Sequence, residues 1–118
     1  MSGGPASVNQ DNAPECAPVY EAGLPILGIC YGMHRMIQDA RGNVEMNPHT
    51  REFGARNIEL KDTCGLTDGV YFMGERYKVW MSHGDTVTEL PPEYRVISGS
   101  DNTPNIIAGP QERYGVQF

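Results

Sequence analysis

Cys30 is flanked by glycines two residues before it and two residues after it, in the sequence Gly28-Ile29-Cys30-Tyr31-Gly32. This spacing is typical of a nucleophile elbow, a tight strand-to-helix turn that is too crowded for side chains at the two glycine positions. At such a turn the helix dipole favours the thiolate, and the next backbone N–H, that of Tyr31, is free to bind an oxyanion. The pattern predicts a cysteine nucleophile. The structural alternative is a buried cysteine between packing glycines.

The residues around Cys30 predict the strand and the helix that this turn requires. Residues 25–30 form a short apolar run without alternation, which indicates a strand covered on both faces, as in a parallel sheet. From residue 31 to residue 41 the apolar side chains recur at helical spacing, and Gly42 is expected to end the helix. The apolar positions of this helix are Met33, Met36, Ile37 and Ala40.

A thiolate nucleophile needs a histidine base, and the chain has three histidines. His34 follows Cys30 by one helical turn and is expected on the helix surface, while His49 lies in a polar segment and is expected in solvent. His83 belongs to a His-Gly-Asp turn after an apolar strand, where it could pair with Asp85 or serve as an ordinary turn residue. The sequence identifies no convincing base. Cys30 and His34 share a helix face, but no further ligands follow at zinc-like spacing, so no metal site is expected.

The remainder of the chain is mostly strand-like. Residues 1–23 read as a loop with a short helix-compatible piece at 19–22. Strands are expected at 44–46, 55–61, 70–73, 78–81, 94–98, 105–108 and 114–118, separated by Gly-, Asp- and Pro-rich turns. One strand–helix unit followed by a strand-rich half predicts an α/β fold with additional antiparallel strands.

Composition excludes several classes of function. The 118 residues suffice for one small domain, and the formal net charge of -6 argues against nucleic acid or an anionic membrane as the main partner. No apolar run has the length of a bilayer and no signal peptide is evident, so a cytoplasmic location is expected. Three widely spaced cysteines disfavour a disulfide scaffold and leave at least one thiol free.

Five segments, taken in order, resemble the class I glutamine amidotransferase domain. The resemblance extends from residue 2 to residue 118 and points to the branch of that class that supplies ammonia for the amination of xanthosine monophosphate. It implies a flavodoxin-like α/β fold with a mostly parallel central sheet and additional antiparallel strands. The segments are residues 2–5 (Ser-Gly-Gly-Pro), 25–33 (Pro-Ile-Leu-Gly-Ile-Cys-Tyr-Gly-Met), 51–54 (Arg-Glu-Phe-Gly), 80–85 (Trp-Met-Ser-His-Gly-Asp) and 114–118 (Tyr-Gly-Val-Gln-Phe).

The resemblance also assigns roles to individual residues. It makes Cys30 the nucleophile that attacks the side-chain amide of glutamine, with the N–H groups of Gly4 and Tyr31 as the oxyanion hole. Substrate-binding positions are His34, Ser82, His83 and Gly84. His34 departs from the family, which usually has a glutamine there, and an imidazole cannot reproduce the paired donor and acceptor of an amide.

By the same resemblance, parts of the enzyme lie outside these 118 residues. Family members place a first strand and helix before Ser-Gly-Gly-Pro, and a His-Pro-Glu segment after Gly-Val-Gln-Phe supplies the base and its orienting acid. The chain alone is therefore expected to have little activity. The resemblance implies an ATP-pyrophosphatase synthetase domain as the partner, in the same polypeptide or a separate subunit, which uses ATP and Mg²⁺. This chain has no Walker-type loop, so no cofactor of its own is expected.

Two other functions remain open at this point. The chain could be a self-contained thiol hydrolase of the peptidase or deglycase type that uses Cys30, His83 and Asp85. It could also be a catalytically dead regulatory module that binds glutamine or a synthetase.

Overall fold

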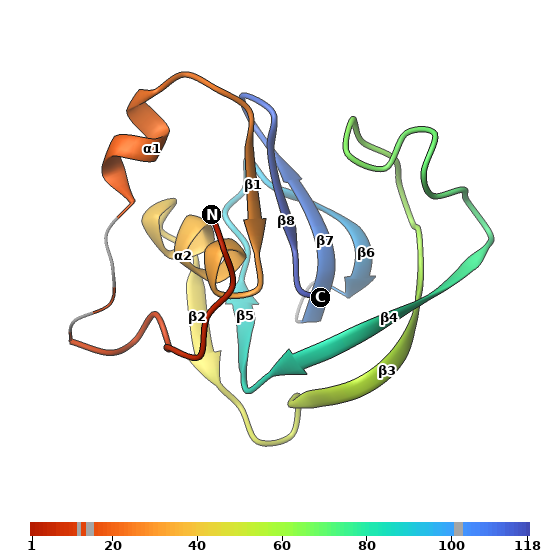
Figure 1. Cartoon of the computed structure of the whole chain (residues 1–118), viewed down its shortest axis with the longest axis horizontal. Coiled ribbons are helices and arrows are strands. Elements are labelled where there is room, and N and C mark those ends of the chain that lie inside the picture. The colour runs from red at the N-terminus through yellow and green to blue at the C-terminus, as the bar shows by residue number, and fades with distance from the viewer. Residues whose placement is uncertain (12, 14–15, 101–102) are drawn as a thin grey trace.

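The computed structural model describes residues 1–11, 13, 16–100 and 103–118. Figure 1 shows the helices on one side of a central sheet and a long, curved strand pair below it. Neither helix of the described part combines the length and the hydropathy that a membrane-crossing helix needs. The elements are α1 (Ala17–Glu21), β1 (Ile26–Ile29), α2 (Tyr31–Asp39), β2 (Asn43–Met46), β3 (Glu52–Glu59), β4 (Arg76–His83), β5 (Asp85–Glu89), β6 (Arg95–Ser100), β7 (Thr103–Gly109) and β8 (Arg113–Val116).

The central sheet has the strand order β1-β8-β7-β6 and confirms the predicted α/β class. β1 and β8 run parallel, whereas β8 with β7 and β7 with β6 run antiparallel. The described sheet is thus mixed, with more antiparallel pairing than the expected mostly parallel sheet. The reason is connectivity: residues 110–112 suffice to join β7 to β8, and so short a connection permits only antiparallel neighbours, while β1 and β8 are separated by α2 and several strands.

Two apolar clusters cover the two faces of this sheet. On one face α2 buries Met33, Met36 and Ile37 against Val44 of β2 and Val87 of β5, which confirms the predicted helical stripe. On the other face the β3–β4 pair encloses a second cluster. That cluster includes Ile58, Leu60, Val79, Met81, Ile97, Ile106, Ala108 and Val116.

The strand that leads to Cys30 is covered on one face, not on both as predicted. Ile26 is buried on the α2 side, but Leu27 is 36% exposed and Ile29 is 39% exposed. The physical reason is position: β1 lies at one edge of the sheet, and the β3–β4 pair contacts β6 at the opposite edge. The apolar composition of a strand indicates that it is suited to burial, but it does not indicate which elements pack against it.

The strand predictions differ from the structure in two further places. The strand predicted at residues 70–73 is absent; main-chain N–H groups there bond back to Thr67, and Val70, Phe72 and Met73 are more than half exposed. β5 was not predicted, although its Asp-Thr-Val-Thr-Glu sequence alternates, and it pairs antiparallel with β2. In both places the deciding factor is whether a partner strand is present, which a local pattern does not contain.

Candidate active site

The turn between β1 and α2 has the geometry that the glycine spacing predicts. Cys30 adopts φ 50° and ψ −107°, a strained conformation for a residue with a side chain, and it is the N-cap residue of α2. A Cβ atom on Gly28 would lie 2.7 Å from main-chain atoms of Gly32, and one on Gly32 would meet the Met1 carbonyl. Both positions therefore require glycine, because backbone atoms occupy the space of a side chain.

The parallel pairing of β1 and β8 places Cys30 beside Gln117. The Cys30 N–H donates to the Val116 carbonyl at 2.8 Å, one residue beyond the last pair of the two strands. The Gln117 N–H donates to the Asn105 carbonyl at 2.9 Å, which anchors that residue to β7. Since the carboxyl ends of parallel neighbours meet at one edge of a sheet, both side chains emerge at the same place.

A cleft of about 350 Å³ opens at this edge, a size within the range of roughly 300–1,000 Å³ that is usual for small-molecule sites. All seven predicted site residues line it, together with Asp85; their chemical roles stay predictions. They come from the N-terminal segment, the elbow, and the corner between β4 and β5. The lining residues are Gly4, Pro5, Ala6, Ser7, Gln10, Cys30, Tyr31, His34, Met46, Phe53, Ser82, His83, Gly84 and Asp85.

Main-chain hydrogen bonds hold the N-terminal segment beside the elbow. The Met1 amino group donates to the Leu27 carbonyl at 2.7 Å, and the Ile29 N–H donates to the Met1 carbonyl at 3.0 Å. A Cβ atom on Gly3 would lie 3.5 Å from the Cβ of Cys30, so the chain passes close to the nucleophile just before Gly4. This arrangement places a second stretch of backbone beside the Cys30 side chain.

The Cys30 sulfur is half-buried and has two polar contacts besides the main chain of its own turn. Its thiol donates to the Ser82 main-chain carbonyl at 3.9 Å, and it accepts from Gln117 Nε2 at 3.6 Å. Burial raises the pKa of the Cys30 thiol; hydrogen bonds from the Tyr31 N–H and Gln117 lower it, and the charge of Asp85 raises it. The net direction is upward, contrary to the prediction from the helix dipole, because desolvation of the thiolate outweighs the donors around it.

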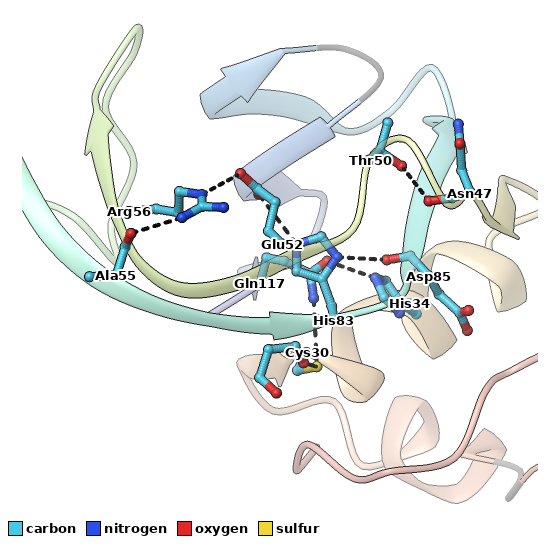
Figure 2. A network of polar contacts seen from close by, with 11 residues as sticks. Cys30, His34, Asn47, Thr50, Glu52, Ala55, Arg56, His83, Asp85 and Gln117 are labelled. Atoms are coloured by element: carbon cyan, nitrogen blue, oxygen red, sulfur yellow. Dashed lines mark hydrogen bonds and ion pairs between the residues drawn. The ribbon is translucent and has the colours of Figure 1, made fainter.

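His83 is not placed to act as a base for Cys30. Its Nδ1 donates to the main-chain carbonyl of Asp85 at 2.8 Å, and its Nε2 faces the Glu52 carboxylate at 3.3 Å (Figure 2). Nδ1 therefore serves as a donor to a carbonyl, and the other ring nitrogen, Nε2, faces Glu52 and not the thiol. The self-contained hydrolase that would use Cys30, His83 and Asp85 gains no support, since within the described residues the sulfur has no hydrogen bond to His83.

His34 is buried, at 4% exposure, and not on the helix surface as predicted. Its Nε2 is 2.7 Å from Oε1 of Gln117, so the nitrogen that reaches furthest from the helix is already bonded to the protein. Burial lowers the pKa of His34 and outweighs the opposing effects of Gln117 and Asp85, which leaves a neutral imidazole at pH 7. His49 is exposed, as predicted.

Gln117 is the site residue that sequence reasoning missed. It is 3% exposed and bonds to both Cys30 and His34, which precede it by 87 and 83 residues. No local pattern marks a glutamine after a strand as a partner of a distant cysteine. In the described part of the chain, no three His, Cys, Asp or Glu side chains come together as metal ligands.

The sequence is similar to proteins named GMP synthase [glutamine-hydrolyzing]. The protein of that name from Rhodopseudomonas palustris is 48% identical over the whole chain, and the one from Thermosynechococcus vestitus is 46% identical over the whole chain. The chain spans 22% of the length of each of these relatives.

Solved structures show the same fold. A glutamine amidotransferase from Methylobacillus flagellatus superimposes with a TM-score of 0.75 at 22% identity, over 98% of this chain and 48% of that one. A glutamine amidotransferase from Thermotoga maritima has a TM-score of 0.72 at 20% identity, over 86% of this chain and 43% of that one. The family model of class-I glutamine amidotransferases matches residues 1–118. On this match over its full length, together with the elbow at Cys30, the chain belongs to the class-I glutamine amidotransferase family.

Proposed function

We propose that this chain is the part of a longer enzyme that hydrolyses glutamine, with Cys30 as the nucleophile. The observation that carries the proposal is the strained Cys30 turn at the edge of a cleft, bordered by glycines where close backbone packing leaves no room for a side chain. Acyl transfer to sulfur requires this combination of an accessible thiolate and main-chain N–H groups that face the same point.

The proposed reaction begins when the ionised sulfur attacks the side-chain amide carbon of glutamine. The resulting oxyanion accepts hydrogen bonds from the N–H groups of Tyr31 and Gly4. Collapse of the tetrahedral intermediate breaks the C–N bond, and the nitrogen takes up the proton that the thiol lost on ionisation, delivered by the base expected outside these residues. Ammonia departs and a glutamyl thioester of Cys30 remains. Water then cleaves the thioester, which releases glutamate and restores the thiol.

In this proposal the ammonia is used elsewhere in the longer protein. The relatives that are named GMP synthase [glutamine-hydrolyzing] are more than four times as long as this chain, which supports a second catalytic unit as the partner. We assign to that unit the ATP- and Mg²⁺-dependent amination of xanthosine monophosphate. No step of that reaction is assigned to the residues described here.

The proposal predicts selective labelling by the diazoketone analogue of L-glutamine. Cys30 is expected to be alkylated at least about tenfold faster than Cys16 or Cys64, because only a thiol beside a formed glutamine pocket meets the analogue in a reactive position. Peptide-resolved mass spectrometry measures the three rates in one sample. Glutamine in excess is expected to slow the labelling of Cys30.

The enantiomer of the analogue is the matched control. It has the same electrophile but misplaces the amino and carboxylate groups, so its reaction with Cys30 is expected to be slow. Equal labelling of the three cysteines, or equal rates for the two enantiomers, would contradict the proposed function.

A further inference from the structure

A chain of side-chain hydrogen bonds connects the nucleophile to the buried histidine of α2. His34 Nε2 is 2.7 Å from Gln117 Oε1, and the other end of that amide, Nε2, is 3.6 Å from the Cys30 sulfur. Figure 2 shows Gln117 between the other two residues, joined to each of them. His34 and Gln117 are 4% and 3% exposed, so the bond between these two side chains is shielded from water.

The chemistry of the three groups fixes the direction of these bonds. Neutral His34 has one ring N–H, and the carbonyl oxygen of Gln117 is an acceptor, so the His34 proton lies on Nε2. With its oxygen held by His34, the Gln117 amide must turn its NH₂ group toward Cys30. The reverse orientation would place the amide oxygen against the anionic sulfur during catalysis.

The two polar contacts that the sulfur makes outside its own turn have opposite effects on its ionisation. The Ser82 carbonyl accepts from the S–H group and therefore favours the thiol, whereas the Gln117 NH₂ donates to the sulfur and favours the thiolate. Gln117 is the side chain that opposes desolvation at this site. Its orientation depends on His34.

We propose that His34 and Gln117 are positioning residues for Cys30: His34 holds the Gln117 amide with its NH₂ toward the sulfur, and this donor promotes ionisation of the nucleophile. The inference deepens the proposed function and rests on it. It gives His34 a role through Gln117 in place of direct contact with substrate.

Other charged groups face this cluster from the elements around it. Asp85 of β5 raises the pKa of the Cys30 thiol by its negative charge, and it acts on His34 as well. His83 of β4, paired with Glu52 of β3, opposes a positive charge on His34. Tyr31 adds its N–H from the first turn of α2. All of these groups are kept in the variants below, so a change in Cys30 ionisation reports on the altered residue.

The test is the pH profile of Cys30 alkylation by iodoacetamide on the full chain, followed by peptide-resolved mass spectrometry. The thiolate displaces iodide to form a thioether, so the rate tracks the thiolate fraction. In Gln117→Met, which has no amide donor, the profile is expected to move to higher pH and the rate at pH 7 to fall about threefold. In Gln117→Glu, which replaces the donor by an anion, the rate at pH 7 is expected to fall about tenfold.

Variants of His34 test whether its N–H group orients the Gln117 amide. His34→Leu removes the donor that orients Gln117, so a fall of about threefold is expected at pH 7. His34→Gln keeps an N–H at a similar reach and is expected to restore the parent profile, which a purely space-filling role of His34 would not require. His49→Leu, at an exposed histidine, is the matched control and leaves the profile unchanged.

Either of two results would overturn the inference. One is a Gln117→Glu profile that coincides with that of the parent chain, and the other is a His34→Gln profile as shifted as that of His34→Leu. If His34→Leu does not fold, as judged by circular dichroism, the two Gln117 variants still decide the matter. Iodoacetamide reacts without a glutamine pocket, whereas the diazoketone requires one. The two tests are therefore independent, and either proposal can fail while the other is supported.

Discussion

Purified as the 118-residue polypeptide, the chain is expected to release ammonia from glutamine roughly four or more orders of magnitude more slowly than a full-length relative such as the Rhodopseudomonas palustris protein. The reason is that no imidazole in the described part of the chain is placed to accept the proton of Cys30. Within the described residues no imidazole bonds to the sulfur: both nitrogens of His83 are engaged, Nε2 of His34 is bonded to Gln117, and His49 does not line the cleft. Loss of the base from a nucleophile–base pair has an effect of about this size.

Ammonia release can be followed by coupling it to glutamate dehydrogenase, with the full-length relative assayed in parallel. The control is Cys30→Ala in the 118-residue polypeptide, which is expected to match the parent within about threefold because little catalysis is there to lose. A rate within a hundredfold of the relative, abolished in Cys30→Ala, would contradict the prediction. It would show that an imidazole of this chain reaches the sulfur after glutamine binds.

The local part of the site could be predicted from the sequence. The strand before Cys30, the stripe on α2, and the need for glycine at positions 28 and 32 are properties of consecutive residues, and the structure confirms each of them. The gathering of Gly4, Ser82 and His83 beside Cys30 was also predicted, but from resemblance to a family. No spacing along the chain contains that information.

The other features of the site depend on which helices and strands pack together, and this packing could not be predicted from the sequence. Gln117 takes part in the site because β8 pairs with β1, although 87 residues separate Gln117 from Cys30. His34 is buried because β8 brings Gln117 to it, although its helical position alone suggested solvent. The ionisation of Cys30 was misjudged for a related reason: the helix dipole is a local property, while desolvation comes from the surrounding β4–β5 corner and N-terminal segment.

Gly28→Ala is expected to lower the free energy of unfolding by about 3 kcal/mol or more, measured by urea denaturation. The added Cβ would lie 2.7 Å from the main-chain carbon and oxygen of Gly32 and 2.8 Å from the nitrogen of Met33. These are backbone atoms in the first turn of α2, so relief requires the helix to move away from β1. Such a movement would separate Met33, Met36 and Ile37 from the sheet that buries them.

Alanine variants at three glycines distinguish a clash with the backbone of α2 from a general intolerance of alanine. Gly115→Ala would meet side-chain atoms of Met33 and Ile107, which can shift, so a loss of about 1–2 kcal/mol is expected. Gly84→Ala has open space around its new Cβ and is expected to change stability by less than about 0.5 kcal/mol. If the three variants lose equal stability, contact with the helix backbone is not the cause. If the stability losses instead follow the predicted order, the turn at Cys30 and the packing of α2 depend on the same residue. Gly28 allows α2 to pack against β1 and also permits the backbone conformation that places Cys30 at the cleft.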